Sequence, residues 1–158
     1  MTKNPPPGHP ITASVLITDP EDRLLIVYPA RQNATWVLPG GAVEQGESPL
    51  DAARREVREE LNLVLDHQIH DLIAVEWLQA TKPGRRDRLA FVFAGPRLHP
   101  SDQDKIILQY DEITAWRWES PLNALRLLHP RIAARIASSL QCRCSTTYLE
   151  TKNPEGTA

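Results

Sequence analysis

The order of expected elements predicts a domain of the α+β or mixed α/β class, in which helices pack on a β-sheet. Short apolar runs with strand character lie on both sides of a central amphipathic helix, and two more helices are expected near the C-terminus. A chain of 158 residues is long enough to bury one hydrophobic core. We therefore expect a single folded domain.

The first part of the chain predicts a hairpin followed by a glycine loop. Residues 11–18 and 24–28 are apolar and β-branched, and the turn signal at residues 19–22 separates them. Residues 36–38 form a short expected strand that leads into a loop at Gly40 and Gly41.

The second part of the chain predicts three strands and two helices. Strands are expected at residues 69–78, 88–94 and 113–118, with a turn at residues 82–87. Helices are expected from residue 120 to about 128 and from residue 130 to about 140, each beginning beside a proline.

Both ends are expected to lie outside the domain, which we place at residues 11–144. Residues 1–10 are rich in proline and predict a flexible arm, whereas residues 145–158 are polar and are expected to fray. Cys142 and Cys144 form a lone C-x-C pair without histidines at ligand spacing. We interpret them as reduced thiols rather than as a zinc site.

The composition argues against several classes of function. The net charge of −2 gives no overall attraction to nucleic acid, and no basic arm or groove is evident. No apolar run reaches the roughly 20 residues of a membrane span, and the N-terminus lacks the apolar core of a signal peptide. We expect a cytoplasmic protein with neither nucleic-acid nor membrane partners.

A central helix is predicted to begin after Ser48 and to end at Asn62. Ser48 is a favourable N-cap, Pro49 suits the first helical position, and Asp51 places a negative charge in the first turn. Asn62 readily takes the left-handed conformation that a helix end needs. Apolar positions recur at three- and four-residue steps and form a stripe for the core, made of Leu50, Ala53, Val57 and Leu61.

Three acids share a sector of this helix beside the apolar stripe. At about 100° per residue, Glu56, Glu59 and Glu60 project together. Glu56 and Glu60 are like charges four residues apart, which costs about 0.2–0.5 kcal/mol in an isolated helix, and Arg55 offsets part of this by pairing with Glu59. A solvated helix face is the plain interpretation. A bound divalent cation, which prefers oxygen ligands, explains the crowding better.

Residues 41–63, GAVEQGESPLDAARREVREELNL, resemble the Nudix box. In that motif, glycine, five residues, glutamate and seven residues precede Arg-Glu-aliphatic-x-Glu-Glu-x-Gly-aliphatic, and Asn62 stands here where glycine is usual. The resemblance implies the Nudix α/β/α sandwich with a central mixed β-sheet. It also implies hydrolysis of a diphosphate linkage by an attacking water, with Mg²⁺ or Mn²⁺ as cofactor.

The resemblance implies roles for the acids by position. Glu59 and Glu60 would be metal ligands, Glu56 would be a ligand or the general base, and the carbonyl of Gly40 would complete the coordination. Arg55 would orient a catalytic glutamate through a charge-assisted hydrogen bond. The identity of the base varies within the family and stays open.

Three further positions follow from the same resemblance. Gly41 and Glu47 belong to the motif and would be structural. Many relatives carry another acid ahead of the last strand, and Glu112 is the candidate metal ligand there, with Asp111 as the substitute. The plain alternative is that Glu112 only begins a surface strand.

Substrate recognition depends on residues outside the motif. Trp36 and Phe91 are candidates for stacking on a base, and Arg86 and Arg88 are candidates for binding phosphates. The plain alternatives are that both aromatic residues belong to the core and that the basic turn is solvated.

The expected substrate is a small-molecule diphosphate, such as a nucleotide or nucleotide sugar. The alternatives are hydrolysis of a non-nucleotide diphosphate, such as a prenyl or inositol diphosphate, and a Nudix domain that senses a nucleotide without turnover. The complete set of acids argues against the sensor. A homodimer is one option, since many relatives are dimers.

Overall fold

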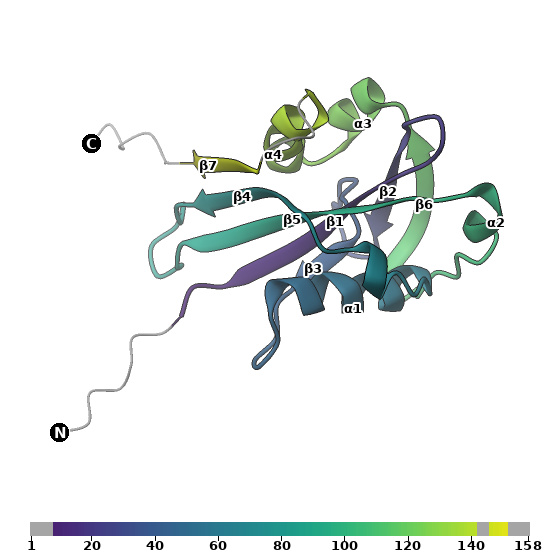
Figure 1. Cartoon of the computed structure of the whole chain (residues 1–158). Coiled ribbons are helices and arrows are strands. Elements are labelled where there is room, and N and C mark those ends of the chain that lie inside the picture. Colours follow the sequence, from purple (N-terminus) through teal and green to yellow (C-terminus); the bar gives the residue numbers. More distant parts are fainter. Residues whose placement is uncertain (1–7, 142–145, 152–158) are drawn as a thin grey trace.

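The computed structural model describes residues 8–141 and 146–151, and Figure 1 shows the arrangement of its elements. In chain order they are β1 (Ile11–Thr18), β2 (Leu24–Pro29), β3 (Gly40–Ala42), α1 (Pro49–Leu61), η1 (Asp66–Gln68), β4 (Leu72–Leu78), β5 (Arg88–Arg97), α2 (Pro100–Gln103), β6 (Ile113–Glu119), α3 (Pro121–Leu127), α4 (Pro130–Gln141) and β7 (Thr147–Thr151).

The strands form one mixed sheet of seven strands in the order β6-β2-β1-β5-β4-β7, with β3 paired to β1 off this path. β1 runs parallel to β5 and β4 runs parallel to β7. The other pairs are antiparallel, including the predicted hairpin of β1 and β2. β1 is thus central, because it pairs with β2, β3 and β5.

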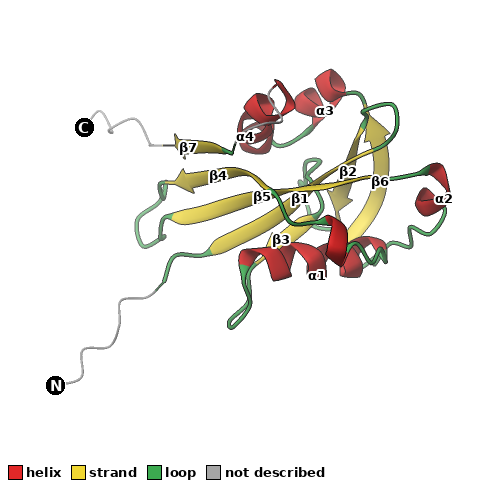
Figure 2. Cartoon of the chain, viewed as in Figure 1, coloured by secondary structure: helices red, strands yellow, loops and turns green. Residues whose placement is uncertain are grey.

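Helices cover both faces of the sheet (Figure 2). On one face, α1 packs through residues such as Val57 against Val15 of β1. On the other face, α3 and α4 pack through residues such as Ile136 against Val92 of β5. This α/β/α arrangement confirms the expected fold class. In the described part of the chain, no helix is long and apolar enough to cross a membrane.

α1 begins and ends at the predicted residues. Ser48 Oγ accepts a hydrogen bond from the Asp51 N–H at 3.1 Å, and Pro49 is the first helical residue. At the other end, Asn62 takes the left-handed conformation with φ of 57°, and its N–H donates to the Arg58 carbonyl at 2.9 Å. These caps fix which side chains α1 presents to the sheet.

The predicted arrangement around Gly40 was wrong. Residues 36–38 do not form a regular strand, since Trp36 and Val37 make only isolated bridges. The expected glycine loop instead forms β3, which pairs with β1. Glycine has a low propensity for strands, so the sequence did not predict a strand here. β3 forms because its backbone packs closely against β1.

The expectation that the C-terminal segment frays was wrong for residues 147–151. They form β7, which pairs in parallel with β4 and so covers the unpaired backbone groups of that edge strand. Two smaller differences are that β4 begins only at Leu72, after η1, and that the short α2 was not expected. Cys142 and Cys144 lie outside the described residues.

Candidate functional site

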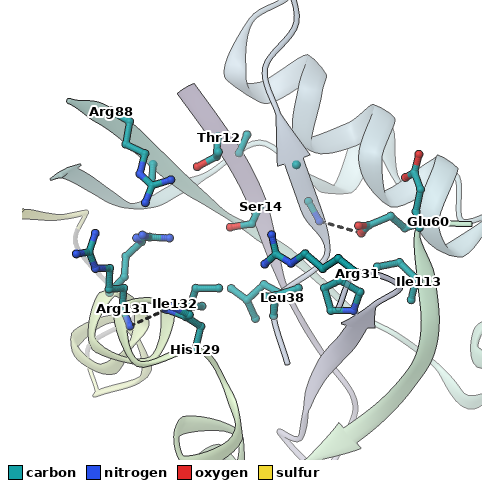
Figure 3. Close-up of a pocket in the computed structure, with 18 of the residues that line it drawn as sticks. Thr12, Ser14, Arg31, Leu38, Glu60, Arg88, Ile113, His129, Arg131 and Ile132 are labelled. Atoms are coloured by element: carbon teal, nitrogen blue, oxygen red, sulfur yellow. Dashed lines mark hydrogen bonds between the residues drawn. The ribbon is translucent and has the colours of Figure 1, made fainter. Parts of the chain in front are cut away.

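Glu56 and Glu60 lie on the side of α1 that faces β3, and both are buried, with 8% and 4% of their surface exposed. Glu60 Oε2 accepts a hydrogen bond from the backbone N–H of Gly40 at 2.9 Å (Figure 3). Residues four apart are neighbours on a helix surface, so α1 places two carboxylates together against one short strand. Glu59 lies at the open edge of this pair, with 44% of its side chain exposed.

β3 accommodates these carboxylates because Gly40 and Gly41 have no side chains. A Cβ atom at Gly41 would lie 2.4 Å from Glu56 Oε1. A Cβ atom at Gly40 would lie 2.3 Å from the carbonyl oxygen of Ala13, and φ there is 142°, where L side chains are strained. Gly41 therefore makes room for a carboxylate, whereas Gly40 makes room for the backbone of β1.

Arg55 connects the acids of the site. Its Nη1 donates to Glu56 Oε1 and to Glu59 Oε2, both at 2.9 Å. Its Nη2 donates to Glu47 Oε1 at 2.8 Å and to the Ala42 carbonyl at 3.0 Å, while Nε donates to Glu47 Oε2 at 3.2 Å. The hydrogen bond from Arg55 lowers the pKa of Glu47. The two hydrogen bonds from Arg55 to Glu47 fix the plane of the guanidinium. Glu47 therefore influences Glu56 and Glu59 through Arg55.

Burial raises the pKa of both inward-facing acids. It raises the pKa of Glu60 to about 8, although the hydrogen bond from Gly40 favours the ionised form, and the charges of Glu56 and Glu112 add to the rise. Burial also raises the pKa of Glu56, against the opposing hydrogen bond from Arg55. Full ionisation of these acids would create more negative charge than Arg55 offsets, so the metal-free site retains a proton to a higher pH than an exposed carboxylate does.

Glu112 joins this site from a distant part of the sequence. It lies in the turn before β6, and its carbonyl accepts a hydrogen bond from the Ala30 N–H at 2.7 Å, which ties the turn to the loop after β2. Its exposed side chain lines the same cavity as Glu60, as does Asp111. The fold thus brings Glu112 to the cavity that Glu60 lines, and its role as a metal ligand stays a prediction from the resemblance.

The oxygen donors of this site suit a hard divalent cation such as Mg²⁺ or Mn²⁺. Within residues 8–141 and 146–151, no three His, Cys, Asp or Glu side chains already surround one point in the manner of a metal cage. Carboxylate oxygens are instead engaged by Arg55 and by the Gly40 N–H. A cation would supply the positive charge that two buried carboxylates lack, so the residues fit a metal ion.

A cavity of about 540 Å³ opens beside the acids. Glu60 lies at one end of it, and the opposite wall carries Arg88, His129 and Arg131 (Figure 3). Glu112 also lines the cavity, and its charge acts on Glu60. The cavity thus joins a site for a cation to a basic wall, a combination that suits a ligand with several negative charges.

The residues predicted for substrate recognition are dispersed. Arg88 lines this cavity, and Arg86 lines an adjoining one. Trp36 packs edge-on against a tyrosine ring, with 5.3 Å between centroids, and Phe91 stacks on Phe93 at 6.5 Å beside the core under α1. Neither Trp36 nor Phe91 is among the described residues that line the two cavities.

Arg31, His129 and Arg131 also line the cavity, and the sequence did not predict them as site residues. Arg31 lies in the irregular loop after β2, and the other two lie where α4 begins. None belongs to a recognisable motif. The packing of α4 on the sheet brings His129 and Arg131 to the cavity, whereas the pairing of β2 with β1 brings Arg31 there. The sequence therefore carried no signal that could have identified them.

Comparison with known proteins establishes the family. A model of the NUDIX domain matches residues 8–140, which is most of the chain. The chain belongs to the Nudix family. An RNA pyrophosphohydrolase of Rhodopseudomonas palustris is 32% identical over 109 residues, covering 60% of this chain and 64% of that protein. An uncharacterised Nudix hydrolase of Bacillus subtilis is 31% identical over 107 residues, covering 61% and 62%.

Solved structures share the Nudix fold. The crystal structure of a MutT protein from Methanosarcina mazei has a TM-score of 0.69 at 19% identity, covering 87% of this chain and 96% of that one. A Nudix hydrolase from Nitrosomonas europaea has a TM-score of 0.71 at 17% identity, covering 93% and 81%. The chain matches between 24% and 64% of the length of its curated relatives. These similarities establish the family and the fold. The substrate has to be inferred from the residues of the site.

Alanine at Gly40 and alanine at Gly41 should lower the free energy of unfolding to different extents. Gly40→Ala forces a side chain against backbone atoms at a strained φ, so we expect a loss of about 2–5 kcal/mol of unfolding free energy. Gly41→Ala meets only the movable end of Glu56, so we expect a loss below about 1.5 kcal/mol. Urea denaturation measures both, and equal losses would contradict the distinction between the two positions.

The stability of the metal-free protein should fall as pH rises from about 4.5 to about 8. Glu60 has an ordinary pKa of 4.5 when unfolded and about 8 when folded. Between these values the folded state holds the extra proton, so raising the pH favours unfolding. Urea denaturation in EDTA across this range measures the trend. Glu60→Gln, which has no proton to lose, should flatten it, and identical pH dependence in both proteins would count against the shifted pKa.

Proposed function

We propose that this Nudix domain is a divalent-metal-dependent hydrolase that cleaves a diphosphate linkage by attack of water at phosphorus. The observation that carries this proposal is the burial of Glu56 and Glu60 against Gly40 and Gly41, with Arg55 held beside them. A buried, crowded set of carboxylates is costly for folding alone, whereas it suits the binding of a cation and an anionic substrate.

Each acid has a distinct role in this proposal. Glu59, Glu60 and the Gly40 carbonyl would hold the metal ion, with Glu56 as a further ligand or as the base. The metal, when bound, offsets the charge of the diphosphate and lowers the pKa of a bound water. Arg55 touches both Glu56 and Glu59. It would hold those carboxylates in position, and Glu112 would contribute from the turn before β6.

The proposed substrate is a nucleoside diphosphate derivative such as a nucleotide or nucleotide sugar, with a non-nucleotide diphosphate as the alternative. Several relatives are named RNA pyrophosphohydrolases. The lining of the second cavity includes Lys82, Arg85, Arg86, Arg88 and Arg131 and forms a basic groove, of which the sequence indicated only the basic turn. A 5′-triphosphorylated oligonucleotide therefore belongs in any substrate panel beside the small molecules.

Hydrolysis should require a divalent cation. We expect at least one member of a diphosphate panel to be cleaved with Mg²⁺ or Mn²⁺, and cleavage to stop in excess EDTA and return when metal is restored. Chromatographic detection of the released phosphate or monophosphate measures this. Undiminished turnover after complete removal of metal would contradict the mechanism. Binding of one compound, with no cleavage of any, would favour the sensor instead.

Substitution of single acids should rank their roles. Glu56→Gln and Glu60→Gln should each lower kcat/KM by roughly a hundredfold or more, because each removes a charge at the reacting centre. Glu112→Gln should cost roughly tenfold, since its side chain is exposed and lies outside the helix cluster. Steady-state kinetics over a range of Mg²⁺ concentrations measures all three.

Asp51→Asn is the matched control for this series. It also removes one negative charge from α1, but it lies in the first turn, far along the helix from Glu60, so the rate should stay near that of the unmodified protein. Its cost in stability should be below about 1 kcal/mol. Normal rates for folded Glu56→Gln and Glu60→Gln would overturn the assignment.

A further inference from the structure

Three arginines that line the main cavity make no ion pair with any described residue. Arg31 comes from the loop after β2, Arg88 from the start of β5 and Arg131 from the start of α4. Within the described residues, none of their side chains makes an ion pair or a hydrogen bond. Arg135, on the next turn of α4, differs because it is buried and its Nε donates to Glu76 at 2.6 Å.

The charges of these arginines act together on His129. Burial lowers the pKa of its imidazole, and the charges of four arginines lower it further, namely Arg131, Arg31, Arg135 and Arg88. Side chains from three separate elements therefore act on one ring. Like charges brought together repel each other, so a fold that gathers them without a counterion is suited to an anionic ligand.

A second cavity of about 510 Å³ adjoins the first and shares Leu78, Arg88 and Arg131 with it. Its described lining includes Lys82, Arg85 and Arg86 but no acidic residue. Arg88 and Arg131 therefore lie at the junction of the two cavities, where positive side chains predominate on both sides.

The described lining of both cavities contains no Phe, Tyr or Trp. His129 supplies the one aromatic ring of the described lining, and Arg31, Arg88 and Arg131 surround it with positive charge, so recognition there depends mainly on charge. Arginine is well suited to it, because its planar guanidinium can bind two phosphate oxygens at once and stays protonated.

We propose that Arg31, Arg88 and Arg131 bind a phosphate group that the substrate carries apart from the diphosphate linkage held by the acids. The inference rests on the proposed hydrolase activity and defines its substrate class as diphosphates with an additional, remote phosphate. The Glu60 end of the cavity receives the linkage with its metal ion, and the arginines receive the remote phosphate.

Matched coenzyme pairs test this selectivity. Coenzyme A and dephospho-coenzyme A differ by one phosphate remote from the diphosphate, and so do NADP and NAD. We expect kcat/KM to favour the phosphorylated member of at least one pair by roughly tenfold to a hundredfold, as for a charged hydrogen-bonded contact. Arg88→Gln and Arg131→Gln should bring this ratio toward one.

The ratio is measured within each variant, so partial unfolding affects both substrates alike. Arg126→Gln is the control, because Arg126 is an exposed arginine of α3 that lines neither cavity, and it should leave the ratio unchanged. Equal cleavage of both members of each pair by the unmodified protein would overturn the assignment of the arginines to the substrate.

A binding measurement in EDTA tests the site without catalysis. Inorganic phosphate is titrated while the imidazole of His129 is followed by NMR, with His129→Gln to assign the signal. A phosphate dianion beside the ring should raise the pKa of His129, and the double variant Arg88→Gln/Arg131→Gln should abolish the rise. If the pKa rises but no diphosphate is cleaved, the hydrolase proposal fails and the phosphate site stands. An unchanged pKa in the folded protein would overturn the phosphate site, whatever the hydrolysis shows.

Discussion

The structure of the site depends on the close packing of α1 against β3. That contact buries Glu56 and Glu60 over Gly40 and Gly41, where β3 has no side chains. Each carboxylate loses most of its hydration there, and its pKa rises as a result. The fold therefore maintains an electrostatically unfavourable arrangement through its backbone geometry, and the binding of a cation is the simplest way to offset it.

The remaining features of the site support this contact. β1 pairs with β3 on one side and with β5 on the other. This one strand therefore sets the position of the acids over β3 relative to Arg88 at the start of β5. Arg55 is itself fixed by Glu47 and by the carbonyl of Ala42, which is part of β3. The same short strand thus sets the positions of the glycines, of the buried acids and of the arginine that bridges them.

Local signals in the sequence predicted the parts of the fold that depend on neighbouring residues. The caps at Ser48 and Asn62, the apolar stripe of α1 and the β-branched apolar run of β1 are such signals, and each has its expected form in the structure. The spacing of the motif also predicted that Glu56 and Glu60 would lie together, since residues four apart on a helix are neighbours. Glu112 could be proposed only through the family resemblance, because its approach to the helix depends on the whole sheet.

The features that the sequence did not predict depend on tertiary contacts. β3 consists of residues with poor strand propensity, and β7 exists because the edge of β4 is available to it. Arg31 from the loop after β2 meets His129 and Arg131 at the start of α4 only in the folded chain, and no pattern in these segments indicates this. Trp36 and Phe91 were plausible substrate contacts by residue type, yet in the structure they pack against other aromatic rings.

The central claim is that the acids of α1 and the Gly40 carbonyl form one metal site. Crystals soaked in Mn²⁺ test it directly, because anomalous scattering locates manganese without any assumption about the protein. We predict a peak within about 2.5 Å of oxygens from Glu59 or Glu60 and of the Gly40 carbonyl, and we predict that it is lost in Glu60→Gln. A folded, Mn²⁺-saturated protein with manganese bound elsewhere, and with this position empty, would contradict the account.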